Sequence, residues 1–218
     1  MGQARRVSSG AAAGSEHLRG IVRAVTLHQS ILTVVLAIGG YLLGATPFAL
    51  LVARHLYGVD IRRVGTGNIG AGNTFHQVSK KAGALVMACD MAKGFLPALA
   101  AVLLLPSWPT AVVAFMPTLG HQFSVFLRGA GGKGIATAAG AELPLSPPVF
   151  VITMVLWVIA LRIRRIAKLS PLVAGATYLA SSFVLDVPPA YRVLAVAVCA
   201  SVLWAHRREL RALRTRGV

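Results

Sequence analysis

The uncharged sequence SILTVVLAIGGYLLGATPFALLV, residues 30–52, decides the fold class of this chain. A helix needs about 20 predominantly apolar residues to cross the hydrocarbon core of a bilayer, and this stretch exceeds that length. It contains no Asp, Glu, Lys or Arg. The stretch therefore predicts a transmembrane helix close to the N-terminus.

The composition of the whole chain agrees with a membrane protein. Of its 218 residues 56% are hydrophobic and 13% are charged, whereas soluble domains carry roughly a quarter charged residues. The net charge of +16 alone would fit a nucleic-acid-binding protein, but such proteins lack long uncharged apolar runs. We therefore expect no nucleic-acid partner. Cys89 and Cys199 lie inside apolar runs without metal-ligand or disulfide spacing, and we expect both to be packing residues.

Apolar runs, divided at charges and at Pro/Gly turns, predict an all-α integral membrane protein with about seven transmembrane helices. The fourth run is too short for an ordinary span and is expected to be shielded by its neighbours. The domains predicted are a basic, disordered tail (1–28), a seven-helix membrane domain (29–206) and a basic tail (207–218). The predicted spans are residues 30–52, 83–105, 110–127, 135–145, 149–161, 169–185 and 191–204.

The distribution of Lys and Arg over the loops predicts the orientation in the membrane. Cytoplasmic loops carry an excess of these residues. Alternate connections, residues 106–109, 141–148 and 186–190, contain neither. The C-terminus is therefore expected in the cytoplasm and the N-terminus outside, although the tail also holds arginines. The loop cations are Arg54, Arg62, Arg63, Lys80, Lys81, Arg128, Lys133, Arg162, Arg164, Arg165, Lys168 and five arginines from Arg207 onward.

The sequence DIRRVGTGNIGAGN, which we name the Asp60 segment (residues 60–73), is rich in glycine and small polar residues. Glycine lets the backbone approach a ligand and turn with positive φ, so a segment of this kind can surround an anion with N–H groups. The alternative is a flexible linker between two spans. The interleaving of Gly with Thr66, Asn68 and Asn73 favours anion binding.

The sequence GAGGKGIAT, the Lys133 segment (residues 129–137), has the appearance of a nucleotide P-loop. However, Gly134 follows Lys133 where Ser or Thr should coordinate magnesium, and a membrane span precedes the segment instead of a strand. ATP binding is therefore disfavoured. A lysine among glycines at the start of a helix suits a phosphate group, because the helix N-terminus favours anions. The alternative is a simple anchor at the cytoplasmic surface.

Other polar residues leave two interpretations open. Asp90 and Lys93 share one helical face inside the second span, as a self-neutralising pair or as substrate ligands. His121, within the third span, by itself suits a packing role more than a chemical one. His55 and Asp60 match the H-x4-D pattern of one acyltransferase family but lack its flanking residues, so we interpret their spacing as chance.

Together these segments resemble the acyl-phosphate:glycerol-3-phosphate acyltransferases of bacterial inner membranes, the PlsY family, over about residues 42–213. The closing His206 also falls where that family has a histidine. The blocks that carry the resemblance are G-S-x-P-x-G at residues 44–49, D-x-R-x-x-G-S-G-N-x-G-A-T-N at 60–73, D-x-x-K-G at 90–94, G-H-x-F-P-V-F at 120–126 and G-G-K-G-V-A-T at 131–137.

The chain departs from the family pattern at several positions, of which Thr66 for serine is mild because it keeps the hydroxyl, and it is a divergent member by this measure. Ala45 and Lys168 stand where the family has serine, and His76 stands where it has arginine. Glu209 and Ala212 replace Asn and Arg in the closing block. The loss of an arginine removes a permanent phosphate partner.

The resemblance implies transfer of a fatty acyl group from acyl phosphate to the 1-hydroxyl of glycerol 3-phosphate. The products are lysophosphatidate and phosphate, and the site faces the cytoplasm of a bacterial inner membrane. Because acyl phosphate is already activated, neither a metal nor a cofactor is expected. The alternatives are an anion transporter or channel, and an acyltransferase with a thioester donor. Cation–glycine loops at the ends of the spans, without an internal repeat, disfavour a transporter.

The same resemblance assigns roles to individual residues. Thr66, Asn68 and Asn73 are expected to orient the hydroxyl and the acyl carbonyl, and the substrate phosphate to take the proton. The residues expected to be catalytic are Thr66, Asn68, Lys133 and His121. The residues expected to bind substrate and phosphate are Arg62, Gly67, Gly70, Gly72, Asn73, His76, Gly131, Gly132, Gly134 and His206.

Overall fold

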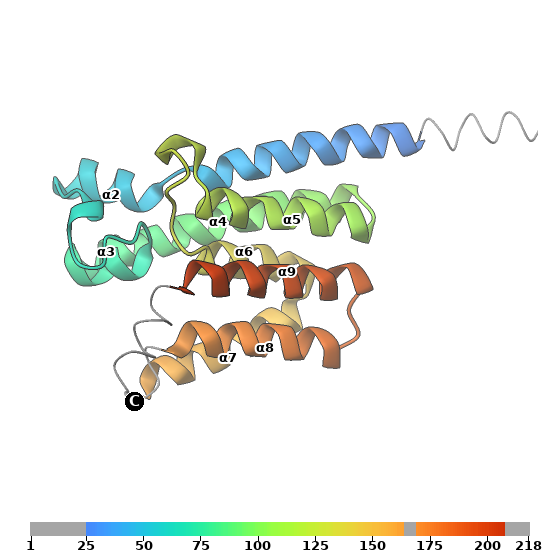
Figure 1. Cartoon of the computed structure of the whole chain (residues 1–218). Helices are drawn as coiled ribbons and strands as arrows, with labels where there is room; N and C mark the ends of the chain where they lie inside the picture. The colour runs from blue at the N-terminus through green and yellow to red at the C-terminus, as the bar shows by residue number, and fades with distance from the viewer. Residues whose placement is uncertain (1–24, 164–168, 208–218) are drawn as a thin grey trace, which may run out of the picture.

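The computed structural model describes residues 25–163 and 169–207, which form helices joined by short connections (Figure 1). Within these ranges there is no strand. Residues 25–45 form the first helix. The elements that follow are α2 (Phe48–Tyr57), the 3-10 turn η1 (Ile61–Arg63), α3 (Ala71–Gln77), α4 (Lys80–Leu104), α5 (Ser107–Gln122), η2 (Val125–Leu127), α6 (Ile135–Leu145), α7 (Pro147–Arg162), α8 (Ser170–Val184) and α9 (Pro189–Ala205).

The first helix and α2 together form the long apolar segment Val25–Tyr57, which is interrupted at residues 46–47. Pro47 causes the interruption, because proline has no N–H to donate and disfavours helical backbone in the residue before it. Gly58 ends α2 in the left-handed region, with φ of 67°. The break leaves the carbonyls of Ala45 and Thr46 outside the regular helical hydrogen bonds, and groups from other helices donate to them.

Helix α4 is the centre of the bundle and packs against α2, α3, α5 and α6. Its contact with α6 is close because glycines meet backbone there. A methyl group on Gly94 would collide with the carbonyl of Thr137, and one on Gly140 would collide with the backbone at Met91. Small residues at helix contacts are typical of membrane proteins. The close contact brings the middle of α4 next to the start of α6.

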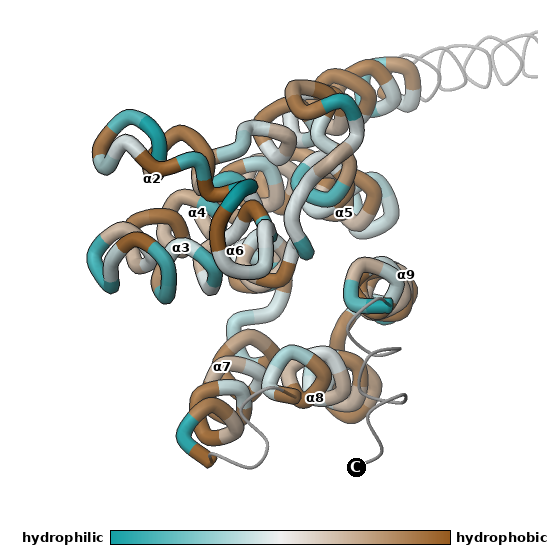
Figure 2. Tube along the Cα trace, turned by 60° about the vertical axis from the view of Figure 1, so that its left-hand side comes forward, coloured by the Kyte–Doolittle hydropathy of each residue, from teal (hydrophilic) through white to brown (hydrophobic). Residues whose placement is uncertain are grey.

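The C-terminal helices form the other side of the bundle. Helix α7 packs against α8, and α9 contacts both α8 and α5. Figures 1 and 2 both place α7 and α8 far from the first helix, with α9 between them and α5. The apolar core here includes Ala98, Ala114, Tyr178, Leu194 and Val198. Helix α9 therefore connects the α4–α6 half of the bundle to the α7–α8 pair.

Apolar residues recur along the helices, as the hydropathy colouring in Figure 2 shows, and many of the large ones are exposed. Val35, Leu103 and Ile159 are 60%, 73% and 49% exposed, on three different helices. Soluble proteins rarely expose contiguous apolar surface of this extent. Among the described residues, three helices are long and apolar enough to cross a membrane: Val25–Tyr57, Lys80–Leu104 and Ser107–Leu127. The chain is an all-helical integral membrane protein.

Each predicted span lies on helical residues, although 30–52 is divided between the first helix and α2 and 110–127 between α5 and η2, and the short fourth run matches α6 (Ile135–Leu145) at both ends. The break at residues 46–47 and the short helix α3 were not predicted. Helix α3 has only seven residues, with Gly70 just before it and Gly72 inside it, so its sequence shows no recognisable helical period. Residues 25–28 of the predicted tail are already helical. The rest of that tail, together with Lys168, Glu209 and Ala212, lies outside the described residues.

Candidate functional site

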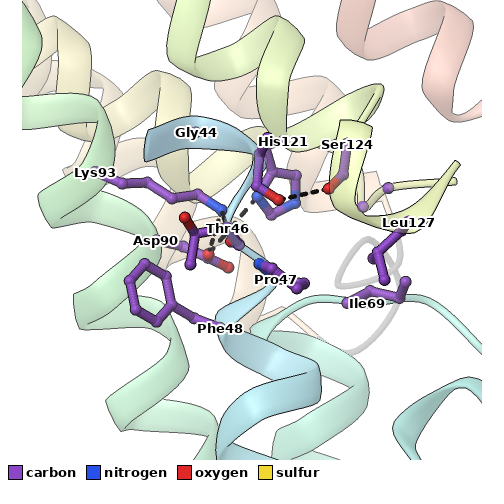
Figure 3. Close-up of a pocket in the computed structure, with 13 residues that line it drawn as sticks. Gly44, Thr46, Pro47, Phe48, Ile69, Asp90, Lys93, His121, Ser124 and Leu127 are labelled. Atoms are coloured by element: carbon purple, nitrogen blue, oxygen red, sulfur yellow. Dashed lines mark hydrogen bonds and ion pairs between the residues drawn. The ribbon is translucent and has the colours of Figure 1, made fainter. Parts of the chain in front are cut away.

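A small polar pocket lies where the first helix is interrupted (Figure 3). It brings together the break, the middle of α4, the end of α5 and both glycine-rich segments. Figure 3 shows the side chains of Asp90, Lys93 and His121 directed toward Thr46. The lining residues are Gly44, Ala45, Thr46, Pro47, Phe48, Ile69, Asp90, Lys93, His121, Ser124, Leu127, Gly131 and Gly132.

Asp90 and Lys93 form a buried ion pair in α4. Lys93 Nζ lies 2.9 Å from Asp90 Oδ1, and each side chain is 2% exposed. The same ammonium donates a hydrogen bond of 3.1 Å to the carbonyl of Thr46 and lies 5.7 Å from the ring centroid of Phe48. Leu50 N, the usual helical partner of this carbonyl, donates to Pro47 instead, and the carbonyl accepts from Phe48 N as well as from Lys93. These contacts favour the self-neutralising interpretation of the pair.

His121 connects this ion pair to the glycine-rich segments. Its Nδ1 lies 3.6 Å from Asp90 Oδ1 and 3.3 Å from Thr137 Oγ1, at the start of α6. Its carbonyl accepts a hydrogen bond of 2.9 Å from Gly132 N. A methyl group on Gly132 would collide with His121 Nε2 and with the carbonyl of Ile69. His121, the Asp60 segment and the Lys133 segment therefore meet at Gly132.

A buried hydroxyl, that of Ser124, contacts the N-terminal side of the helix break at Ala45. Ser124 is 2% exposed, and its Oγ donates a hydrogen bond of 2.5 Å to the carbonyl of Ala45. Ala45 is one of the positions where this chain lacks the family's serine. The pocket thus retains a hydroxyl beside residue 45, supplied by a different residue.

In the Asp60 segment, Asp60 and Arg62 bind each other. Arg62 Nε donates to Asp60 Oδ1 at 2.9 Å, and Arg62 Nη2 donates to Oδ2 at 2.6 Å. The hydrogen bonds from Arg62 hold the pKa of the Asp60 carboxyl well below its usual range, and the carboxylate raises the pKa of Arg62. Because the carboxylate is engaged by Arg62, it does not orient His55, which is exposed on α2. This supports the interpretation of the H-x4-D spacing as chance.

Asn73 fixes the shape of the Asp60 segment. Its Nδ2 donates to the carbonyls of Ile61 and Val64, both at 3.1 Å, and its Oδ1 accepts from Thr66 N at 3.1 Å. Gly65 has φ of 58°, and a methyl group there would collide with Asn73 Oδ1. The amide is 7% exposed, so its contacts are to the segment itself.

Three further residues with predicted roles, Thr66, Asn68 and His76, lie in the Asp60 segment and in helix α3. The Thr66 hydroxyl accepts a hydrogen bond of 3.3 Å from Asn68 N and is exposed, and Asn68 is half-buried. His76, on α3, is exposed and makes an edge contact with Phe75. Among the predicted glycines of this segment, Gly67 has φ of 68°, and Gly72 is exposed on α3. None of these residues is among those that line the described pocket.

The Lys133 segment leads into α6 through Gly134, which has φ of 82°. Lys133 is half-buried, and its carbonyl accepts a hydrogen bond of 3.0 Å from Gln122 Nε2. Gly131 lies so close to α5 that a methyl group would collide with the carbonyls of His121 and Gln122. The segment is therefore held against the end of α5 on both sides of Lys133.

His206 lies at the C-terminal end of α9, away from the lining of the pocket. It is 5% exposed, and its Nδ1 is 2.8 Å from the carbonyl of Val202 on the same helix. Next to it, the Arg207 guanidinium lies 3.6 Å from the ring centroid of Trp204, which contacts Phe123 after α5. This aromatic contact joins the end of α9 to the end of α5.

The structure thus brings His121, Gly131 and Gly132 into one pocket and places Thr66, Asn68 and Lys133 in the segments that meet there. Sequence reasoning did not single out Gln122, Ser124 or the Thr46 carbonyl. For Gln122 and Ser124 the available signal was their position, as polar residues at the end of an apolar run. Among the described residues no group of three His, Cys, Asp or Glu side chains could hold a metal ion.

Comparison with known proteins places the chain in a family. Residues 34–216 match the family model for glycerol-3-phosphate acyltransferase. The glycerol-3-phosphate acyltransferase of Myxococcus xanthus is 40% identical over 187 residues, which cover 85% of this chain and 97% of that protein. The enzyme of Rubrobacter xylanophilus is 41% identical over 183 residues, covering 84% and 92%.

Two solved structures share the fold. The crystal structure of PlsY (YgiH), an integral membrane glycerol 3-phosphate acyltransferase in its glycerol 3-phosphate form, has a TM-score of 0.80 and 34% identity. It covers 84% of this chain and 92% of its own. The lysophosphatidic acid form has a TM-score of 0.79. The predicted family is confirmed: the chain belongs to the glycerol-3-phosphate acyltransferases and is an enzyme of that family.

Proposed function

We propose that this enzyme transfers a fatty acyl group from acyl phosphate to the 1-hydroxyl of glycerol 3-phosphate. The hydroxyl oxygen bonds to the acyl carbonyl carbon, the bond from that carbon to the phosphate oxygen breaks, and inorganic phosphate leaves. The product is lysophosphatidate, and the hydroxyl proton passes to a phosphate of the substrates. Solved relatives are described with glycerol 3-phosphate and with lysophosphatidic acid, which supports this acceptor and this product.

The observation that carries the proposal is the contact between the two glycine-rich segments. At Gly132 the Lys133 segment lies against the Ile69 carbonyl of the Asp60 segment, with no room for a methyl group between them. Each substrate carries a phosphate, so two adjacent phosphate-binding segments hold the acyl carbonyl and the hydroxyl close together. Holding two reactants in this way removes much of the entropic cost of a bimolecular step.

The phosphate ligands in this proposal are cations and backbone N–H groups. Asp60 engages Nε and Nη2 of Arg62, and the guanidinium remains half-exposed, with Nη1 outside these two bonds. Lys133 supplies the second cation, on the leaving phosphate, where negative charge develops. The remaining proposed phosphate ligands are Gly67, Gly70, Gly72, His76, Gly131, Gly132, Gly134 and His206.

The proposed catalytic residues have distinct tasks. The Thr66 hydroxyl, whose oxygen accepts from Asn68 N, keeps its own proton for the substrate. The Asn68 side chain orients the acyl carbonyl. Asn73 acts through the shape of the turn, since its amide is engaged by the segment itself. His121 supports the junction of the two segments through its carbonyl, which accepts from Gly132 N.

We further propose seven spans in a bacterial inner membrane, with the N-terminus outside and the site facing the cytoplasm. The asymmetry of Lys and Arg between alternate loops supports this orientation. A reporter fused after Val218 should be active in the cytoplasm, and one inserted at Pro147 only outside. The reverse pattern would contradict the orientation, because the glycine-rich segments would then face away from cytosolic substrates.

The donor is tested with purified protein in detergent and radiolabelled glycerol 3-phosphate. Labelled lysophosphatidate should form with palmitoyl phosphate, together with an equal amount of inorganic phosphate, and not with palmitoyl-CoA. Product from palmitoyl-CoA alone would replace the proposed donor with a thioester. Product from neither donor, with uptake of labelled phosphate into proteoliposomes, would favour a transporter. A mock purification without the protein is the control.

A further inference from the structure

Gln122, the last residue of α5, connects three segments with one side chain. It is 4% exposed. Its Nε2 donates a hydrogen bond of 3.0 Å to the carbonyl of Lys133 and lies 3.3 Å from Ser201 Oγ on α9. The amide thus attaches the Lys133 segment to α5 and α9. In the family pattern G-H-x-F-P-V-F residue 122 is the unspecified position.

The glycines on either side of Lys133 also lie against Gln122. A methyl group on Gly131 would collide with the Gln122 carbonyl, and one on Gly134 would press on the Gln122 side chain. Gly134 has φ of 82°, so the backbone turns sharply just after Lys133. Gln122 therefore contacts the Lys133 segment on both sides of the lysine, beside the contacts that His121 and Thr118 make with the same glycines.

The same amide is unfavourable for stability. Among the described residues its Oε1 is buried without a hydrogen-bond partner. A buried acceptor without a partner costs folding free energy, which an apolar side chain of similar length would avoid. Local violations of this kind are expected where a residue serves a site and not the fold alone. What the amide contributes is the pair of donated hydrogen bonds.

We propose that Gln122 is a positioning residue of the acyl transfer, acting through Lys133. By holding the Lys133 carbonyl it fixes the residue whose ammonium stabilises the leaving phosphate. The inference rests on the phosphate role proposed above for Lys133. Gln122 itself touches the segment and not the substrate, so its loss should affect the same kinetic constant as the loss of the lysine.

The test is the variant Gln122→Met, which keeps the length of the side chain and removes both donors. We expect kcat to fall about tenfold with little change in KM, because a displaced ammonium acts mainly on the transition state. The melting temperature should change little, because removal of the unpaired acceptor offsets the loss of the two donated hydrogen bonds. Gln122→Glu, which replaces the donor facing the Lys133 carbonyl by an acceptor, should show the same loss and keeps the test valid if Gln122→Met does not fold.

Thr110→Val is the matched control on the same helix. The Thr110 hydroxyl is fully buried at the opposite end of α5 and donates to the carbonyls of Ala101 and Leu105. Its removal should lower the melting temperature and leave kcat unchanged. The opposite responses of Thr110→Val and Gln122→Met separate a structural hydrogen bond from a positioning one.

A double-mutant cycle with Lys133→Ala decides whether Gln122 acts through the lysine. In the Lys133→Ala background, Gln122→Met should cost less than twofold. An equal loss in both backgrounds, or wild-type kcat in Gln122→Met beside an impaired Lys133→Ala, would overturn this inference alone. Wild-type turnover in Lys133→Ala would overturn the phosphate role of Lys133 and, with it, the positioning role of Gln122.

Discussion

Lys93 and Lys133 lie near the same junction but in opposite surroundings. Lys93, in the middle of α4, is 2% exposed and is engaged by the Asp90 carboxylate and the Thr46 carbonyl. Lys133 is half-buried in a glycine-rich turn, where Gln122 holds its backbone. One lysine stabilises the interrupted helix, and the other stands in the segment that we propose for the leaving phosphate.

The comparison shows how a membrane enzyme can place cations without destabilising its fold. A charge inside the bilayer is costly and requires an internal partner, which in turn uses up its capacity to bind substrate. A cation at the end of the spans can remain near water, where its charge is less costly. The predictions below test this division between a structural and a functional lysine.

The largest effect is expected at the buried pair. Lys93→Met would leave the Asp90 carboxylate without its partner, and breaking a buried ion pair from one side costs about 3–5 kcal/mol. The free energy of unfolding, measured by denaturant titration in detergent, should fall by that amount. Lys93→Met combined with Asp90→Asn should recover most of the loss. An unaltered free energy of unfolding in Lys93→Met would contradict the structural role of Lys93.

The second effect is kinetic. Lys133→Ala removes a charge-assisted hydrogen bond worth about 1.5–3 kcal/mol, so kcat should fall roughly tenfold to a hundredfold. The free energy of unfolding should stay the same, whereas Lys93→Met is expected to lower it. Lys133→Arg should restore little, because its planar guanidinium has a different shape and stem. Acyl transfer is compared at matched concentrations of protein that elutes normally in size exclusion.

A smaller effect is expected at Ser124. Ser124→Ala removes one neutral hydrogen bond to the Ala45 carbonyl, worth about 0.5–1.5 kcal/mol, so kcat/KM should fall about two- to tenfold. Ala45→Ser in the Ser124→Ala background should recover part of the activity, because it returns a hydroxyl to the same pocket. If Ala45→Ser recovers no activity in that background, the Ser124 hydroxyl does not take the place of the serine in the family pattern.

The smallest effect is expected at His55, which is exposed on α2 while Asp60 is engaged by Arg62. His55→Ala should retain most of the acyl-transfer activity. A loss above roughly a hundredfold, or about 2.7 kcal/mol of barrier, would show that the H-x4-D spacing has a catalytic meaning after all.

The spans could be predicted from the sequence because lipid requires long apolar runs and the chain is interrupted by charges and turns. Residues 135–145 illustrate this, since Gly134 and Ser146 bound α6 as the sequence indicates. Pro47 by itself does not indicate the interruption, because the apolar run continues through it. Local patterns thus predicted where helices lie better than where they are interrupted.

The site could be predicted only in part. The glycine-rich segments were recognisable because glycine interleaved with small polar and basic residues is typical of anion-binding turns. The contacts that join them could not be derived, because Gln122 and Lys133, or Ser124 and Ala45, meet only through the packing of distant helices. Likewise, Asn73 looked like a substrate ligand, and only the geometry shows its amide engaged by Ile61 and Val64.

The central claim is that the two glycine-rich segments form one site at Gly132, and Gly132→Ala tests it most directly. A methyl group there would collide with His121 Nε2 and the Ile69 carbonyl, whereas one on Gly39 would meet nothing within 4 Å. Both variants are compared by kcat/KM for labelled glycerol 3-phosphate with palmitoyl phosphate. We expect Gly132→Ala to lose about a hundredfold while eluting as folded protein, since small displacements cost that much, and Gly39→Ala to match wild type. Wild-type activity in Gly132→Ala would contradict the claim.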